Sequence, residues 1–183
     1  ICGPYRLEWS GRPLGVKSRD CNVFVDNDGE AYFVSTTEEN TNIGLFRLAD
    51  DYLSAESHVC LMPGLRREAP VIVRHDNLYY MLSSACTGWA PNQCMLSVSK
   101  RLDRGWSQLE KIGDDKAFRT QAAAVIEIKG TKKTTYLYIG DRWMDPDLPS
   151  SKIIIFPIEF KDGKCIFEYR DEFRINFTTG EVE

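Results

Sequence analysis

One pattern recurs three times along the chain and constrains its fold more than any other feature. Each unit opens with a polar triplet, followed by an apolar run, a tight turn, an aromatic-bearing run and further short apolar runs. The triplets contain Asp20, Glu68 and Gln121, so successive units are 48 and 53 residues apart. A repeat of about 40–50 residues with four strands is typical of a β-propeller blade. Because one four-stranded sheet cannot cover both of its faces, such units must stack on one another.

The apolar runs predict strands and almost no helix. Turn residues separate them, such as Asp-Asn-Asp-Gly at 26–29, a hairpin turn of the Asp-Gly type. A short helical candidate at 49–53 is interpreted as a turn. Expected strands are 22–25, 31–35, 43–48, 71–74, 78–83, 95–99, 106–109, 123–128, 135–140, 153–159 and 165–169. The chain is therefore predicted to be all-β.

The length bears on how many units are present. With 183 residues and about 50 per blade, the chain holds three to four blades. Propellers usually close with four to eight blades, and an open ring exposes sheet faces and strand edges. We therefore expect residues 1–183 to be a partial propeller domain, with one blade or more missing on its N-terminal side.

Composition and charge exclude several classes of function. Hydrophobic residues make up 43% of the chain, which is enough for a packed core. The net charge is −4 without a basic block, so neither nucleic acid nor an anionic membrane is expected as a partner. No apolar run reaches the roughly 18 residues of a membrane span. Phosphate-loop and dinucleotide motifs, CxxC pairs and clustered histidines are all missing, so neither a cofactor nor a metal ion is expected.

The six cysteines leave two interpretations open. Cys86 and Cys94 bracket a compact loop and are the first pair to test for a disulfide. Free buried thiols are an equally good interpretation.

The three polar openings are the candidates for chemistry. The innermost strand of a blade lines the central channel, so residues at the start of three such strands converge at one mouth. Two carboxyl groups and an amide there suit acid–base work, since burial and a neighbouring charge hold one carboxyl protonated. Glycoside hydrolysis needs such paired carboxylates. The structural alternative is that these residues cap strands or bond to neighbouring backbone.

Five short motifs occur in order along the chain. They are Ser-Arg-Asp at 18–20, Arg-Glu-Ala-Pro at 67–70, Cys-Thr-Gly-Trp-Ala-Pro-Asn at 86–92, Phe-Arg-Thr-Gln at 118–121 and Asp-Arg-Trp at 141–143. Together they resemble glycoside hydrolase family 43, and most closely its branch of exo-β-1,3-galactanases. The resemblance runs from about residue 3 to residue 160 and implies a five-bladed β-propeller, an inverting mechanism, a polysaccharide substrate and an extracellular location.

The resemblance also implies roles for the three polar residues. Glu68 matches the general acid, and Asp20 matches the carboxylate that raises the acid's pKa and orients it. Gln121 matches a glutamine that positions the attacking water, whereas most of the family uses an aspartate from the first blade. We expect Asp20 and Glu68 in one pocket, Gln121 across a sugar-sized gap and a raised pKa for Glu68. Activity on arabinose or xylose polymers, and sugar binding without catalysis, remain alternatives.

Other residues are candidates for holding the sugar. Trp89 and Trp143 are expected either to stack on a pyranose or to pack in the core. Arg19 and Arg119 are expected to bond substrate hydroxyls or to pair with a carboxylate, and for the third such arginine, Arg67, the structural role is favoured. Asp141 either bonds a sugar hydroxyl or fixes the neighbouring Arg142.

Overall fold

Three antiparallel sheets of four strands each make up the computed structural model, which describes residues 2–183. The first sheet has the order β1 (Ser18–Val25), β2 (Ala31–Thr37), β3 (Asn42–Leu48), β4 (Ala55–Met62). The second has the order β5 (Arg67–His75), β6 (Leu78–Ala85), β7 (Cys94–Ser99), β8 (Glu110–Ile112). The third has the order β9 (Gln121–Lys129), β10 (Thr134–Arg142), β11 (Lys152–Lys161), β12 (Lys164–Ile166).

Helix is confined, within the described residues, to three single 3₁₀ turns. They are η1 (Pro13–Gly15), η2 (Ala117–Arg119) and η3 (Leu148–Ser150). No helix in residues 2–183 is long and apolar enough to cross a membrane. The all-β prediction is confirmed.

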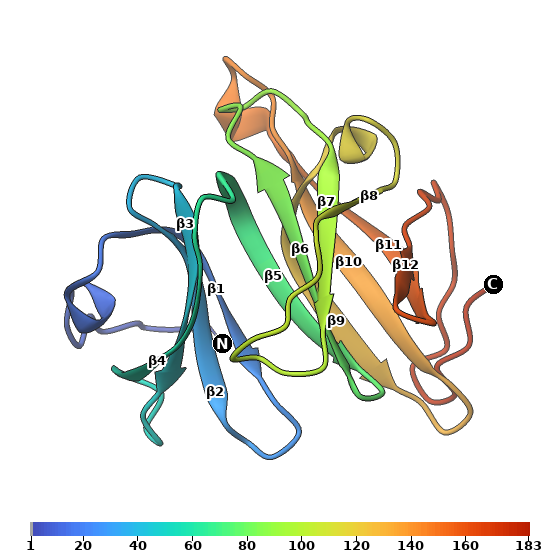
Figure 1. Cartoon of the computed structure of the whole chain (residues 1–183). Helices are drawn as coiled ribbons and strands as arrows, with labels where there is room; N and C mark the ends of the chain where they lie inside the picture. The colour runs from blue at the N-terminus through green and yellow to red at the C-terminus, as the bar shows by residue number, and fades with distance from the viewer. Residues whose placement is uncertain (1) are drawn as a thin grey trace.

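The sheets stand side by side, with the first (blue to teal) and the third (gold to red) on either side of the second (Figure 1). The innermost strands β1, β5 and β9 are neighbours in space. Because the second sheet is covered on both faces, its strands β5 and β6 contain continuous apolar runs rather than alternating ones. Along β6, Met81 packs toward the first sheet, while Tyr80 and Leu82 pack toward the third.

The first and second sheets are also joined by a polar contact at their β1–β2 and β5–β6 ends. The buried carboxylate of Asp26 accepts hydrogen bonds from Tyr79 Oη at 2.6 Å and from Arg74 Nη1 at 2.5 Å. Burial raises the pKa of Asp26, but the bonds from Tyr79, Arg74 and the Asn27 amide outweigh it, so the pKa is lowered overall. This contact fixes the first sheet relative to the second.

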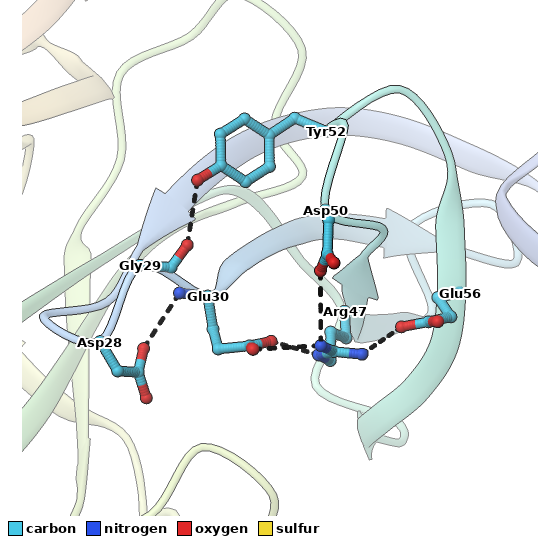
Figure 2. A network of polar contacts seen from close by, with 7 residues as sticks. All are labelled: Asp28, Gly29, Glu30, Arg47, Asp50, Tyr52 and Glu56. Atoms are coloured by element: carbon cyan, nitrogen blue, oxygen red, sulfur yellow. Dashed lines mark hydrogen bonds and ion pairs between the residues drawn. The ribbon is translucent and has the colours of Figure 1, made fainter.

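An ion-pair network holds the strands of the first sheet together at the same end (Figure 2). Arg47 on β3 binds the carboxylates of Glu30, before β2, and Glu56 on β4. Asp50 lies at 3.9 Å from the same guanidinium. The network is partly exposed, so it links the ends of β2, β3 and β4 but is not part of the hydrophobic core.

Each innermost strand is irregular beside its polar residue. The register shifts between Ser18 and Cys21 in β1, between Glu68 and Val71 in β5, and between Ala122 and Ala124 in β9, where it pairs with β10. In β5 the shift coincides with Ala69 in a left-handed conformation (φ 49°) and with Pro70, which has no N–H to donate. Such bulges bend a strand and re-aim its side chains, and they are frequent beside active sites.

Some element predictions were wrong. Residues 106–109 form no strand, because the Ser107 hydroxyl accepts the Val98 amide and the Trp106 indole donates to the Leu102 carbonyl. The last strand of the second sheet is instead the short β8. The sequence interpretation also missed β4, whose exposed polar positions hide its strand pattern. The turn at 49–53 is confirmed.

Candidate active site

A cleft of about 620 Å³ opens where the three innermost strands begin. It contains all three of the predicted catalytic residues and four of the five predicted sugar contacts. Arg119 is the exception, since it lines an adjoining pocket of about 30 Å³. The cleft is lined by Arg19, Asp20, Cys21, Asn22, Asn40, Glu68, Ala69, Pro70, Gly88, Trp89, Gln121, Ala122, Ala123, Asp141 and Trp143.

Glu68 is the most enclosed carboxyl group of the cleft, with 9% of its surface exposed. Each of its carboxyl oxygens accepts one hydrogen bond, from Gln121 Nε2 at 3.0 Å and from Asn40 Nδ2 at 3.1 Å. Burial raises the pKa of Glu68, and the negative charge of Asp20 raises it further, against the opposing effects of Gln121 and two nearby arginines. The predicted direction of the pKa shift is therefore confirmed.

Asp20 is positioned by the bulge in β5. Its Oδ2 accepts the backbone amide of Ala69 at 3.2 Å, a donor that the bulge has released from the sheet ladder. The carboxylate therefore lies beside the main chain that carries Glu68. The two carboxyl groups share one cleft, as predicted.

Gln121 lies closer to Glu68 than predicted, and the expectation of a sugar-sized gap between them was wrong. Its Nε2 group donates to Glu68 Oε1 at 3.0 Å and to Ser84 Oγ at 2.9 Å, while its Oε1 accepts the Trp143 indole N–H at 2.9 Å. Ser84 stands opposite Glu68 on β6 and is nearly buried. Three partners thus hold the amide in a fixed orientation against the acid.

Trp89 and Trp143 form an aromatic pair at the wall of the cleft. Their ring centroids are 5.0 Å apart and their planes are tilted by 59°. Trp89 is 47% exposed, which excludes the core-packing alternative for this residue and leaves indole surface open to a ligand. Trp143 is half-buried.

The arginines and Asp141 divide between structural and cleft positions. Arg67 is buried and donates to the Ser83 and Gln93 carbonyls of its own sheet, in line with the favoured structural role. Arg19 pairs with Glu39 at 2.9 Å at the rim. Asp141 faces the cleft, and burial raises its pKa.

The neighbour of Asp141 is held elsewhere. Arg142 donates to the Phe118 carbonyl at 3.0 Å and lies over the Tyr169 ring, and none of the ion pairs found in residues 2–183 joins it to Asp141. The alternative in which Asp141 fixes Arg142 is therefore not supported.

Two residues of the site were missed from the sequence. Asn40 comes from the β2–β3 turn, where it adopts a left-handed conformation (φ 61°), and nothing in the local sequence marks it. Its Oδ1 is buried without a hydrogen-bond partner. Ser84 was missed for another reason: regular pairing of its hairpin would place Ala85 opposite Glu68, and only the register shift in β5 brings Ser84 there.

Neither metal-ligand clusters nor disulfides occur in the described chain. Within residues 2–183, no group of three or more His, Cys, Asp or Glu side chains is arranged to hold a metal ion. All six cysteines are free; Cys86 is exposed and Cys94 is buried, so the pair suggested by their spacing is not formed.

Comparison with known proteins assigns the family. The sequence profile of the glycosyl hydrolases family 43 matches residues 3–159. The chain belongs to glycosyl hydrolase family 43. No curated protein sequence matches it.

Solved structures similar to this family 43 chain include two exo-β-1,3-galactanases and a β-1,3-galactosidase. An exo-β-1,3-galactanase from Clostridium thermocellum is 38% identical (TM-score 0.88), with 92% of this chain and 38% of that chain covered. One from Phanerochaete chrysosporium, a glutamate-to-alanine variant with β-1,3-galactotriose, is 31% identical (TM-score 0.93), with 100% and 43% covered. A family 43 β-1,3-galactosidase is 32% identical (TM-score 0.85), with 92% and 37% covered. The chain thus spans 37–43% of the length of these structures.

Proposed function

We propose that this family 43 chain carries the acid side of an active site that hydrolyses β-1,3-galactan from its non-reducing end with inversion. The observation that carries the proposal is the state of Glu68, a nearly buried carboxyl whose pKa is raised at the wall of a sugar-sized cleft. The substrate class is supported by the similar exo-β-1,3-galactanases, one of which holds β-1,3-galactotriose. The location proposed for the protein is extracellular.

Glu68 is the general acid of the proposed reaction. Its raised pKa favours the protonated form, and this proton passes to the glycosidic oxygen as the bond to the anomeric carbon breaks. Asp20 supports the acid through its negative charge, which disfavours ionisation of Glu68. The leaving sugar departs as a neutral alcohol.

Gln121 places the attacking water. In the structure both Nε2 hydrogens and one Oε1 lone pair of its amide are occupied, and an inverting site needs about 6.5–9.5 Å between its two catalytic groups. The sugar must therefore enter between Gln121 and Glu68 and break their hydrogen bond. A water at the released amide then adds its oxygen to the anomeric carbon, and the amide, as its imidic-acid tautomer, takes the proton that the water loses.

The sugar is held by the remaining cleft residues. Exposed indole surface on Trp89, with Trp143 behind it, suits the apolar face of galactose. Asp141 and the unpartnered Oδ1 of Asn40 accept hydrogen bonds from sugar hydroxyls, and Arg19 donates hydrogen bonds to sugar hydroxyls from the rim. Arg119 contacts the substrate from the adjoining pocket.

The three sheets are proposed to be consecutive blades of a five-bladed propeller, of which residues 1–183 form part. Exposed apolar residues support further blades on both sides. Val23 (54% exposed) lies on the first sheet, and Ile126 (47%) and Ile153 (68%) lie on the third. The short coverage of the similar structures also supports this arrangement.

Sugar binding without turnover is the second candidate function. The direct contact between Gln121 and Glu68 favours it, because this contact occupies the position that the sugar must take.

One experiment separates the two candidates. Galactose release from β-1,3-galactan is measured for the wild type and for Glu68→Gln, and binding of β-1,3-galactotriose is measured by calorimetry. Release by the wild type that is lost in the variant supports the enzyme, whereas equal release by both refutes the role of Glu68. Binding without release favours the second candidate.

A further inference from the structure

The orientation of the Gln121 amide depends on one neighbour more than on the others. Its two partners on the Nε2 side are a carboxyl group, which can donate when protonated, and the Ser84 hydroxyl, which can turn to donate because its own bond to the Glu68 main-chain carbonyl is long, at 3.4 Å. Its partner on the Oε1 side is the Trp143 indole at 2.9 Å, which can only donate. Only this third contact excludes the flipped amide in every protonation state.

We propose that Trp143 is a positioning residue, whose indole N–H fixes which end of the Gln121 amide faces Glu68. The two ends of the amide have opposite effects on an acid. With Nε2 toward it, Glu68 Oε1 is an acceptor, and its proton must lie on another lone pair. With Oε1 toward it, the protonated Glu68 donates to the amide, and its proton is withheld from the cleft.

The position of Trp143 fits this role. It directly follows β10, the strand that pairs with β9 and so carries Gln121 beside it, with Asp141 opposite Gln121 in the register. The indole is half-buried and packs against exposed Trp89. Trp143 therefore acts on the acid through Gln121, while Trp89 presents the open indole surface of the pair.

Trp89 supplies a matched control. Both indoles belong to the same aromatic pair, yet the Trp89 N–H donates no hydrogen bond within residues 2–183, whereas Trp143 donates one. Replacing either residue by Phe keeps an aromatic ring and removes the N–H. Only Trp143→Phe is expected to free the amide.

The direct test is NMR on the whole chain. In the wild type, the Trp143 indole proton and the Gln121 side-chain amide protons shift together as Glu68 ionises. The Trp143 proton exchanges about tenfold more slowly than that of Trp89, the ratio for one hydrogen bond of about 1.4 kcal/mol. Glu68→Gln removes the shared titration. This arm needs no variant at Trp143, so it holds even if that variant does not fold.

The variants then test cause. In Trp143→Phe the Gln121 amide can flip, so its hydrogen bond to ionised Glu68 is present for only part of the time. The Glu68 carboxyl therefore titrates at higher pH than it does in the wild type or in Trp89→Phe. The other charged groups facing Glu68 are Asp20, Arg19 and Arg67, with the Cys86 thiol nearby, and they are the same in all three proteins. The proposal is overturned if Glu68 titrates at the same pH in all three proteins. It is also overturned if the chemical shift of the Trp143 indole proton does not change as Glu68 ionises.

The consequence for turnover rests on the proposed function. Trp143→Phe should lower kcat and move the basic limb of the kcat/KM pH profile, which reports the free enzyme, to higher pH, whereas Trp89→Phe should act mainly on KM. If the protein releases no galactose, the proposed function fails, while the NMR result still decides the role of Trp143.

Discussion

Replacing Asp26 by Asn tests how the first two sheets are held together. The change removes the negative charge between Arg74 and Tyr79 but keeps the shape of the side chain and one oxygen acceptor. A hydrogen bond to a charged group contributes about 1.5–3 kcal/mol. The Tyr79 hydroxyl can turn to accept from the new amide, so we expect the main loss at Arg74, about 2 kcal/mol in the free energy of unfolding. For a chain of this size, that lowers Tm by about 4–8 °C.

The pH dependence of this loss identifies its cause. The pKa of Asp26 is lowered in the folded protein, so its ionised form stabilises the fold fully above the pKa of an unfolded Asp, about 3.9. That contribution disappears as the pH falls through the lower native pKa. The difference between wild type and Asp26→Asn should therefore be largest at pH 5–7 and shrink below about pH 3.9.

Urea unfolding at pH 7, 5, 4 and 3, followed by tryptophan fluorescence, measures the difference directly. Asp28→Asn is the control, since that carboxylate lies exposed in the same turn and its Oδ1 contact with the Glu30 amide is preserved in Asn. We expect the control within about 0.5 kcal/mol of wild type. A difference for Asp26→Asn that is the same at pH 7 and pH 3 would refute the electrostatic reasoning.

Three further predictions concern the sheets and the thiols. Phe156→Ala should cost about 3–5 kcal/mol in urea unfolding, since Phe156 is fully buried, whereas Ile153→Ala on the same strand should cost little because Ile153 is 68% exposed; equal losses would contradict the assigned core. Arg47→Met should lower the urea midpoint at low salt, and about 1 M salt should remove most of the difference by screening; a salt-independent loss would point to packing instead. Iodoacetamide should label exposed Cys86 in the native protein but not buried Cys94, whose pKa is raised to about 12, until unfolding, as mass spectrometry of the peptides will show; protection of both would indicate a disulfide.

The sequence predicted the convergence of Asp20, Glu68 and Gln121 because equivalent positions of repeated sheets occupy equivalent places. The same periodicity predicted the all-β fold and most strands. It could not show how close Gln121 and Glu68 come, since that distance depends on register shifts in β5 and β9. A shift of one residue leaves no mark in a hydrophobic pattern as short as these.

Asn40 could not be predicted for a related reason. It reaches Glu68 from a turn of the neighbouring sheet in which Glu38, Glu39 and Asn40 all adopt left-handed conformations. Trp143 was predicted either to contact the sugar or to pack in the core, from its residue type and its place in the repeat, and only the structure shows its indole nitrogen turned toward Gln121.

The contact between Asp20 and the Ala69 amide has a consequence for how such a cleft can diversify. The donor is a peptide N–H, which every residue except proline supplies. The separation of the two acids is therefore encoded by the path of the chain and not by the chemistry of a third side chain. The walls of the cleft can be rebuilt for a different ligand while Glu68 and Asp20 keep their spacing.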